Sequence, residues 1–275
     1  MHIAILSGKG GTGKTTVSTN LAMTLGVSYV DCDVEEPNGF IFLNPSIQKS
    51  EDVFMEYPVI DQRTCVLCGA CAKVCQFNAL AKAGKEIVVF EKLCHDCGAC
   101  SLVCKVGALT YAKRSIGKLE SGVAKEITCH RGILNVGEPM AVPVIRKLLS
   151  GLSTEDHFID CPPGTSCSVV TALKYADVAI LVTEPSEFGL HDLKMAIELV
   201  KLYKIPYGII INKDDEKENM IKSHCIENKI TLLGTVPYSM EAAALYSKGI
   251  MLCEDEIYKK LFIGIAEKIK EIFAW

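Results

Sequence analysis

A glycine-rich loop near the start of the chain has the residue types needed to hold a chain of phosphates. Residues 8–15 read Gly-Lys-Gly-Gly-Thr-Gly-Lys-Thr, which satisfies the pattern G-x-x-x-x-G-K-[ST]. In this pattern backbone N–H groups turn toward one anion, the lysine reaches the outer phosphates and the last hydroxyl binds Mg²⁺. The predicted phosphate site consists of Gly8, Gly10, Gly11, Thr12, Gly13, Lys14, Thr15 and Thr16.

The fourteen cysteines are the second group of residues whose types could do chemistry. Eight of them lie in two copies of C-x2-C-x2-C-x3-C. This spacing is typical of ferredoxins with two [4Fe–4S] clusters, in which each fourth cysteine binds the other cluster. One cluster is therefore expected on Cys65, Cys68, Cys71 and Cys104, and the other on Cys94, Cys97, Cys100 and Cys75. Structural zinc is the alternative, but zinc sites usually pair two C-x2-C units without a third cysteine at the same spacing.

Predicted strands and helices alternate on both sides of the cysteine region. Strands are expected at residues 3–7, 28–31, 157–160, 178–183, 207–212 and 231–236, and helices at 14–25, 141–149, 190–203, 216–228 and 255–273. This alternation predicts an α/β fold, with a mostly parallel central sheet flanked by helices. The domains are expected to be residues 1–56 with 114–275, and an inserted α+β ferredoxin-like domain at 57–113.

Two aspartates are expected at the carboxyl edge of this sheet. Asp160 ends a buried strand before Cys-Pro-Pro-Gly, and Asp33 follows the strand at 28–31. Strand-end aspartates often cap turns, but two on one edge beside a phosphate loop favour a functional site.

Composition limits the remaining possibilities. The net charge of −4 argues against a protein that mainly binds nucleic acid. No apolar run reaches the roughly 20 residues of a membrane span, and we expect a cytoplasmic protein. The stripe Ile257, Leu261, Ile265, Ile269 and Ile272 predicts a closing helix that packs on the core, while membrane binding is the less favoured alternative.

A second lysine in the glycine loop, Lys9, makes the loop resemble the deviant motif of MinD/ParA ATPases. Together with Asp33-Val34-Glu35-Glu36-Pro37-Asn38 and the two cysteine motifs, the chain resembles the MinD superfamily of P-loop ATPases with an inserted ferredoxin domain. The resemblance implies ATP/ADP and Mg²⁺ binding, ATP hydrolysis and an ATP-dependent homodimer.

The same resemblance implies roles for individual residues. Lys9 would contact the nucleotide of the partner subunit, Asp33 would orient the attacking water, and Asp160 would support Mg²⁺ through water. The Gly164 N–H would sense the γ-phosphate, Asn212 would read adenine, and Pro237 would belong to the loop that covers the base. By analogy with the nitrogenase iron protein, Cys167 and Cys129 could bind a metal shared between subunits, although packing in the core or a loop is the commoner use of such cysteines.

Three functions follow from the resemblance. The first is ATP-gated electron transfer from two [4Fe–4S] clusters to a partner, and the second is assembly or delivery of metal clusters. In either case the partner would be a redox or metal-cluster protein, such as one of the dinitrogenase iron–molybdenum cofactor type. The third is spatial positioning of the MinD/ParA kind, which gives the clusters no clear task.

Overall fold

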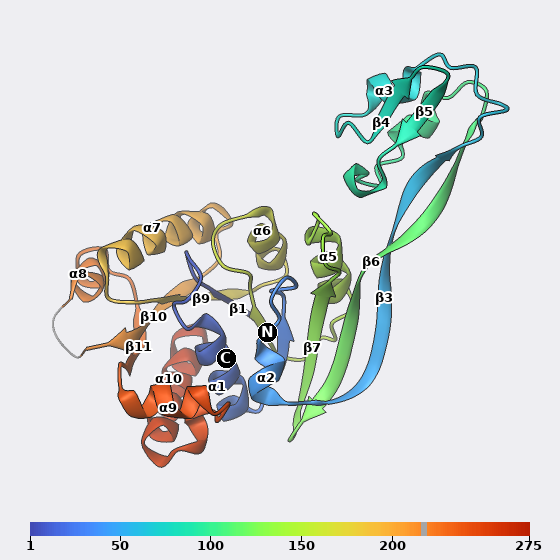
Figure 1. Cartoon of the computed structure of the whole chain (residues 1–275). Coiled ribbons are helices and arrows are strands. Elements are labelled where there is room, and N and C mark those ends of the chain that lie inside the picture. Colours follow the sequence, from blue (N-terminus) through green and yellow to red (C-terminus); the bar gives the residue numbers. More distant parts are fainter. Residues whose placement is uncertain (216–218) are drawn as a thin grey trace.

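The computed structural model describes residues 1–215 and 219–275 and contains one large sheet with helices on both faces (Figure 1). In this sheet the strands follow the order β11-β10-β9-β1-β8-β2-β7-β6-β3. The parallel part of the sheet consists of β1 (His2–Leu6), β2 (Ser28–Asp31), β7 (Ile127–Leu134), β8 (His157–Asp160), β9 (Val178–Thr183), β10 (Tyr207–Asp214) and β11 (Leu232–Pro237). Every residue of β8 and β9 is buried, as expected for a parallel sheet covered on both faces.

The covering helices form two layers. One face packs against α5 (Val142–Ser150), α6 (Cys167–Leu173), α7 (Glu187–Leu202) and α8 (Met220–Glu227). The other packs against α1 (Lys14–Leu25), α2 (Gly39–Leu43), α9 (Met240–Ser247), the short helix η2 (Leu252–Glu254) and α10 (Glu256–Phe273). The predicted α/β fold is therefore confirmed.

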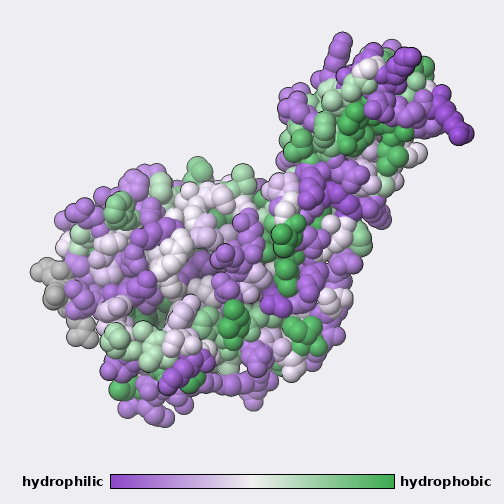
Figure 2. Space-filling model, in the orientation of Figure 1, coloured by the Kyte–Doolittle hydropathy of each residue, from purple (hydrophilic) through white to green (hydrophobic). Residues whose placement is uncertain are grey.

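An antiparallel extension was not expected from the sequence. Strand β7 (Ile127–Leu134) pairs in parallel with β2, and the long strands β6 (Leu109–Ala124) and β3 (Ser46–Ile60) follow it. Beyond the sheet, β3 and β6 continue as a two-stranded arm that carries a small unit away from the main body (Figures 1 and 2). The predicted domain boundaries at Tyr57 and Lys113 fall inside these two strands.

We call residues 61–108 at the tip of the arm the cysteine module. It contains a hairpin of β4 (Leu80–Ala83) and β5 (Glu86–Val89), with the short helices α3 (Ala70–Val74), η1 (Glu91–Leu93) and α4 (Ala99–Leu102). It has a small core of its own, centred on Cys71, Leu80, Ile87 and Cys100.

The closing helix α10 packs on the main body, as predicted. The buried face is formed by Tyr258, Phe262, Ile265, Ala266 and Ile269, whereas Ile257 is exposed, so the predicted stripe was partly out of phase. Helix α8 begins at Met220, and the predicted start at residue 216 lies outside the described residues. No helix in the described part of the chain has the length and apolar character to cross a bilayer.

Candidate functional site

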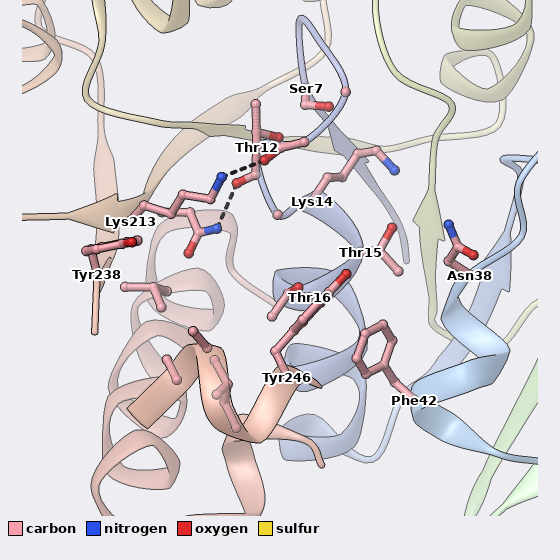
Figure 3. A pocket seen from close by; sticks show the side chains of 18 of the residues that line it. Ser7, Thr12, Lys14, Thr15, Thr16, Asn38, Phe42, Lys213, Tyr238 and Tyr246 are labelled. Carbon is pink, nitrogen blue, oxygen red and sulfur yellow. Dashed lines mark hydrogen bonds between the residues drawn. The ribbon is translucent and has the colours of Figure 1, made fainter. Parts of the chain in front are cut away.

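The glycine loop connects β1 to α1, and residues of β10 support it from the side. The Asn212 side chain donates to the Thr12 carbonyl oxygen at 2.7 Å, and Lys213 donates to the Gly11 carbonyl oxygen at 2.7 Å (Figure 3). Gly13 has a φ of 85°, and a Cβ there would lie 2.0 Å from the Asn212 side-chain nitrogen. Glycine is therefore required at this position both for its backbone conformation and for space.

A cavity of about 500 Å³ opens beside this loop. A volume of this size is typical of small-molecule sites. Inside the loop, the Thr12 hydroxyl is buried and has no hydrogen-bond partner among the described residues. Phe42 of α2 and Tyr246 of α9 lie with ring centroids 5.2 Å apart at one wall (Figure 3). The cavity lining includes Gly10, Gly11, Thr12, Gly13, Lys14, Thr15, Thr16, Asp33, Asn212 and Pro237.

Lys14 is fully buried and paired with Asp160 of β8, with its Nζ 2.5 Å from the carboxylate. Burial alone would lower the pKa of Lys14, but the charge and hydrogen bond of Asp160 outweigh it and raise the pKa. The other Asp160 oxygen accepts a hydrogen bond from the Tyr29 hydroxyl at 2.8 Å. In this conformation Asp160 engages the Lys14 ammonium, which has three N–H donors.

Asp31 and Asp33 lie at the end of β2 and have different surroundings. The Asp31 carboxylate accepts hydrogen bonds from the backbone N–H groups of Asp33 and Gly39, so it fixes the turn that follows β2. Burial, then the nearby charge of Asp160, raises the pKa of Asp31 to about 8. Asp33 lines the cavity, and partial burial raises its pKa to about 6. The sequence had suggested a role for Asp33 only.

Glu184, which follows β9, is a residue whose role the sequence did not reveal. Its carboxylate lies 2.7 Å from Lys9 and 3.3 Å from Lys213, so it ties the glycine loop to β10. Lys9 is thus held within its own subunit here. An acidic residue between a strand and a helix gives no local signal of such a contact.

Gly164 has a φ of 84° and lies in the loop after β8. Its N–H donates to the Ser7 carbonyl oxygen at 2.9 Å. The proposed contact with a γ-phosphate therefore requires this loop to move.

The cysteine module brings together one complete set of predicted ligands. Cys65, Cys68 and Cys71 of the first motif line a small cavity with Cys104 of the second. Cys104 therefore lies beside the first motif, and the crossed assignment of the two clusters stays a prediction. Four thiols without a disulfide provide the soft sulfur ligands that iron–sulfur clusters require.

The two cysteine motifs also have matching backbones. Each has three residues with positive φ at equivalent positions: Leu67, Gly69 and Asn78 in the first, and Asp96, Gly98 and Gly107 in the second. In each, a backbone N–H donates to the sulfur of the fourth cysteine at 3.3 Å, from Ala79 to Cys75 and from Ala108 to Cys104. Such bonds stabilise thiolate ligands, so the chemistry of the residues fits a pair of clusters.

The described residues contain no group of three acidic, histidine or cysteine side chains already converged on one metal-sized point. Two bound clusters therefore remain a prediction. Cys167 is exposed at the start of α6, whereas Cys129 is fully buried on β7 in the core on the other face of the sheet. Burial raises the pKa of Cys129 to about 12, and its position argues against a metal shared between subunits.

Comparison with known proteins gives a family match and several relatives. Residues 3–252 match the family model described as CbiA: CobQ/CobB/MinD/ParA nucleotide binding domain. The uncharacterized protein MJ0578 of Methanocaldococcus jannaschii is 31% identical over 99% of this chain and 95% of its own. An iron-sulfur cluster carrier protein of Pyrococcus horikoshii is 26% identical over 97% of this chain and 84% of its own.

A solved structure supports the fold. The septum site-determining protein MinD of Pyrococcus horikoshii, in complex with Mg-ADP, superimposes with a TM-score of 0.61. It is 20% identical to this chain, and the match covers 98% of this chain and 96% of that protein.

Proposed function

Because the chain belongs to the CobQ/CobB/MinD/ParA family of nucleotide-binding proteins, we propose that it binds and hydrolyses Mg-ATP and couples this cycle to two [4Fe–4S] clusters. The observation that carries the proposal is one chain with both a phosphate loop and a cavity lined by four cysteines from two motifs. A partition-type role in positioning would leave those cysteines unexplained.

The residues of the cavity fit the steps of ATP binding. Lys14 would leave Asp160 for the phosphates, because a triphosphate offers more negative charge than one carboxylate. Thr15 would hold Mg²⁺, and the released Asp160 would orient its water ligands. Asp33 would orient the attacking water at the edge of the cavity.

The cysteine module would hold its two clusters on the sets named above, which supply one-electron redox chemistry when bound. ATP-gated electron transfer to a partner protein is the function we favour. The arm supports it, because β3 and β6 carry the cysteine module out from the main body (Figure 1). Cys68 and Cys97 of this module are exposed, so another protein can approach them.

Delivery of clusters is the second candidate. Relatives named iron-sulfur cluster carrier protein favour it, although they are only about one quarter identical to this chain. The two candidates differ in what leaves the protein: an electron in the first case, iron and sulfide in the second.

An iron inventory tests the proposal. The protein is purified without oxygen, and iron and sulfide per chain are measured before and after incubation with Mg-ATP and a cluster-free acceptor. We expect iron to be retained while a redox acceptor is reduced. Transfer of iron to the acceptor would favour delivery, and a protein without iron would contradict both candidates.

Lys14→Ala is the matched control. The variant should lose ATP binding because its phosphate cation is gone, yet keep a normal iron content because Lys14 lies in the main body. If Lys14→Ala lost both iron and ATP binding, the proposal that the two sites are independent would be contradicted.

A further inference from the structure

The arm leaves the sheet at a defined point. Strand β6 pairs with β7 only as far as Gly117, opposite Leu134, and beyond this pair it continues with β3 alone. The β3–β6 register is irregular at the same place, because Val53 faces Gly117 and Phe54 faces Ser115, so Ile116 is an extra residue. A bulge of this kind bends a strand pair and makes this point the natural pivot of the arm.

On the body side of the pivot, the turn after β2 is joined to the end of β7. The Leu134 N–H donates to the Val34 carbonyl oxygen at 2.8 Å, one residue after Asp33. Val34 is buried, and a Cβ on Gly132 would lie only 2.7 Å from its side chain. Packing this close means that movement at Asp33 moves the end of β7 as well.

Residues 135–140, which we call the relay segment, follow β7 directly. The Asn135 N–H donates to the Ile116 carbonyl oxygen at 2.9 Å, and its side chain donates to the Ser115 carbonyl oxygen at 3.1 Å. The relay segment therefore holds the pivot through backbone atoms.

Two further contacts join the relay segment to the far side of the pivot. Glu138 forms an ion pair with Arg114 of the arm, and only 8% and 11% of these side chains are exposed. Lys92 of the cysteine module donates to the Gly137 carbonyl oxygen at 3.2 Å. Arg114 donates to Glu138 through Nη1. Its Nε and Nη2 atoms are buried and have no hydrogen-bond partner in the part of the chain that the structure describes.

An arginine held in this way favours two distinct states. Separation from Glu138 while buried would leave an unpaired charge, which is strongly unfavourable. Either the pair stays closed, or the arm moves far enough for both groups to reach water.

We propose that Arg114 and Glu138 form a latch by which the nucleotide state at Asp33 controls the position of the cysteine module. Arg114 is a positioning residue in this scheme and takes no part in ATP chemistry. The inference rests on the proposed function, because it assumes that nucleotide moves the turn after β2. It adds the contacts through which that movement would reach the arm.

Hydrogen exchange, measured by mass spectrometry on the intact, anaerobically purified protein with and without Mg-ATP, tests the latch. In the wild type, ATP should change exchange at residues 33–38, 135–140 and 90–97. In Arg114→Gln, the change at 33–38 should remain, while the change at 90–97 should fall at least roughly five-fold, the lower end of ordinary allosteric coupling. The charge-reversed pair Arg114→Glu with Glu138→Arg should restore it.

Other results overturn the latch. An undiminished response at 90–97 in Arg114→Gln, or a double variant that folds and binds ATP without restoring the response, would exclude Arg114–Glu138 as the route. Lys92→Gln gives a second test, since it should weaken the response without disturbing the buried pair. Wild-type protein that binds ATP and holds iron but shows no response at 90–97 would refute the latch while leaving both proposed sites intact.

Discussion

Asp31 illustrates how strongly single residues depend on their surroundings at this site. Its pKa is raised from 3.8 to about 8, first by burial and then by Asp160. The unfolded chain ionises this carboxyl near its ordinary pKa, whereas the folded chain keeps it protonated until about pH 8. Its contribution to stability is therefore fully present below about pH 4 and is lost as the pH rises to about 8.

Asp31→Asn should remove this pH dependence. We expect the free energy of unfolding of the nucleotide-free variant to fall less between about pH 5 and pH 8 than that of the wild type, because the amide does not titrate. Urea unfolding at several pH values measures the slope. Equal slopes in the two proteins would show that Asp31 is not the group responsible.

Cys68 provides a residue-scale test of the crossed cluster assignment. Cys68→Ser removes one ligand of the set that lines the cavity, so we expect iron per chain to fall by roughly half, since one of two clusters loses a ligand. Cys167→Ser is the matched control, because this exposed cysteine lies on α6 outside the module and should leave the iron content unchanged. Unchanged iron in Cys68→Ser would contradict the assignment.

The sequence predicted the glycine loop and the cysteine sets because short, fixed spacings carry their chemistry. It did not predict the ion pairs of Glu184 with Lys9 and Lys213, or the hydrogen bond from Tyr29 to Asp160. The partners in these contacts are far apart in the chain. Only the order of strands in the sheet brings them together.

Among the elements, helix α10 shows how burial decides stability. Phe262 is fully buried against the sheet, so Phe262→Ala should cost about 3–5 kcal/mol of unfolding free energy. Ile257 is exposed on the same helix, and Ile257→Ala should change the free energy of unfolding by less than about 0.5 kcal/mol. Chemical denaturation compares the two, and similar losses would contradict the packing of the helix.

The predicted stripe on this helix was partly wrong because it counted isoleucine and leucine alone. Tyr258 and Phe262 contribute to the buried face, which shifts it around the helix.

Strands β6 and β7 were missed for a different reason. Their sequences carry charged residues on faces that the structure shows to be paired: Arg131 of β7 forms an ion pair with Glu120 of β6, and Lys118 binds the same carboxylate from within β6. Such pairing is visible only when the neighbouring strand is known.

For the whole molecule, the expected ATP-dependent dimer depends on Lys9. This lysine is partly exposed and paired with Glu184, and such surface pairs are weak enough to be released. Lys9→Ala should therefore bind ATP in its own cavity but fail to form the ATP-dependent dimer. Light scattering after size exclusion measures this, with Lys14→Ala as the variant that should not bind ATP at all. A dimer of Lys9→Ala in ATP would contradict the proposed role.

The shape of the molecule could be predicted only in part. The alternation of strands and helices predicted the main body, whereas the long arm depends on pairing between residues 46–60 and 109–124, which are far apart in the chain. Because the arm separates the cysteine module from the phosphate loop, any coupling between the two proposed sites must pass through it.

The most direct test of this account is the electron paramagnetic resonance spectrum of the reduced, anaerobically purified protein, recorded with and without Mg-ATP. We predict the signal of two interacting [4Fe–4S] clusters and a change in its shape when Mg-ATP binds. A protein without an iron–sulfur signal, or a signal that Mg-ATP leaves unaltered at saturating concentration, would contradict the coupling of the two sites.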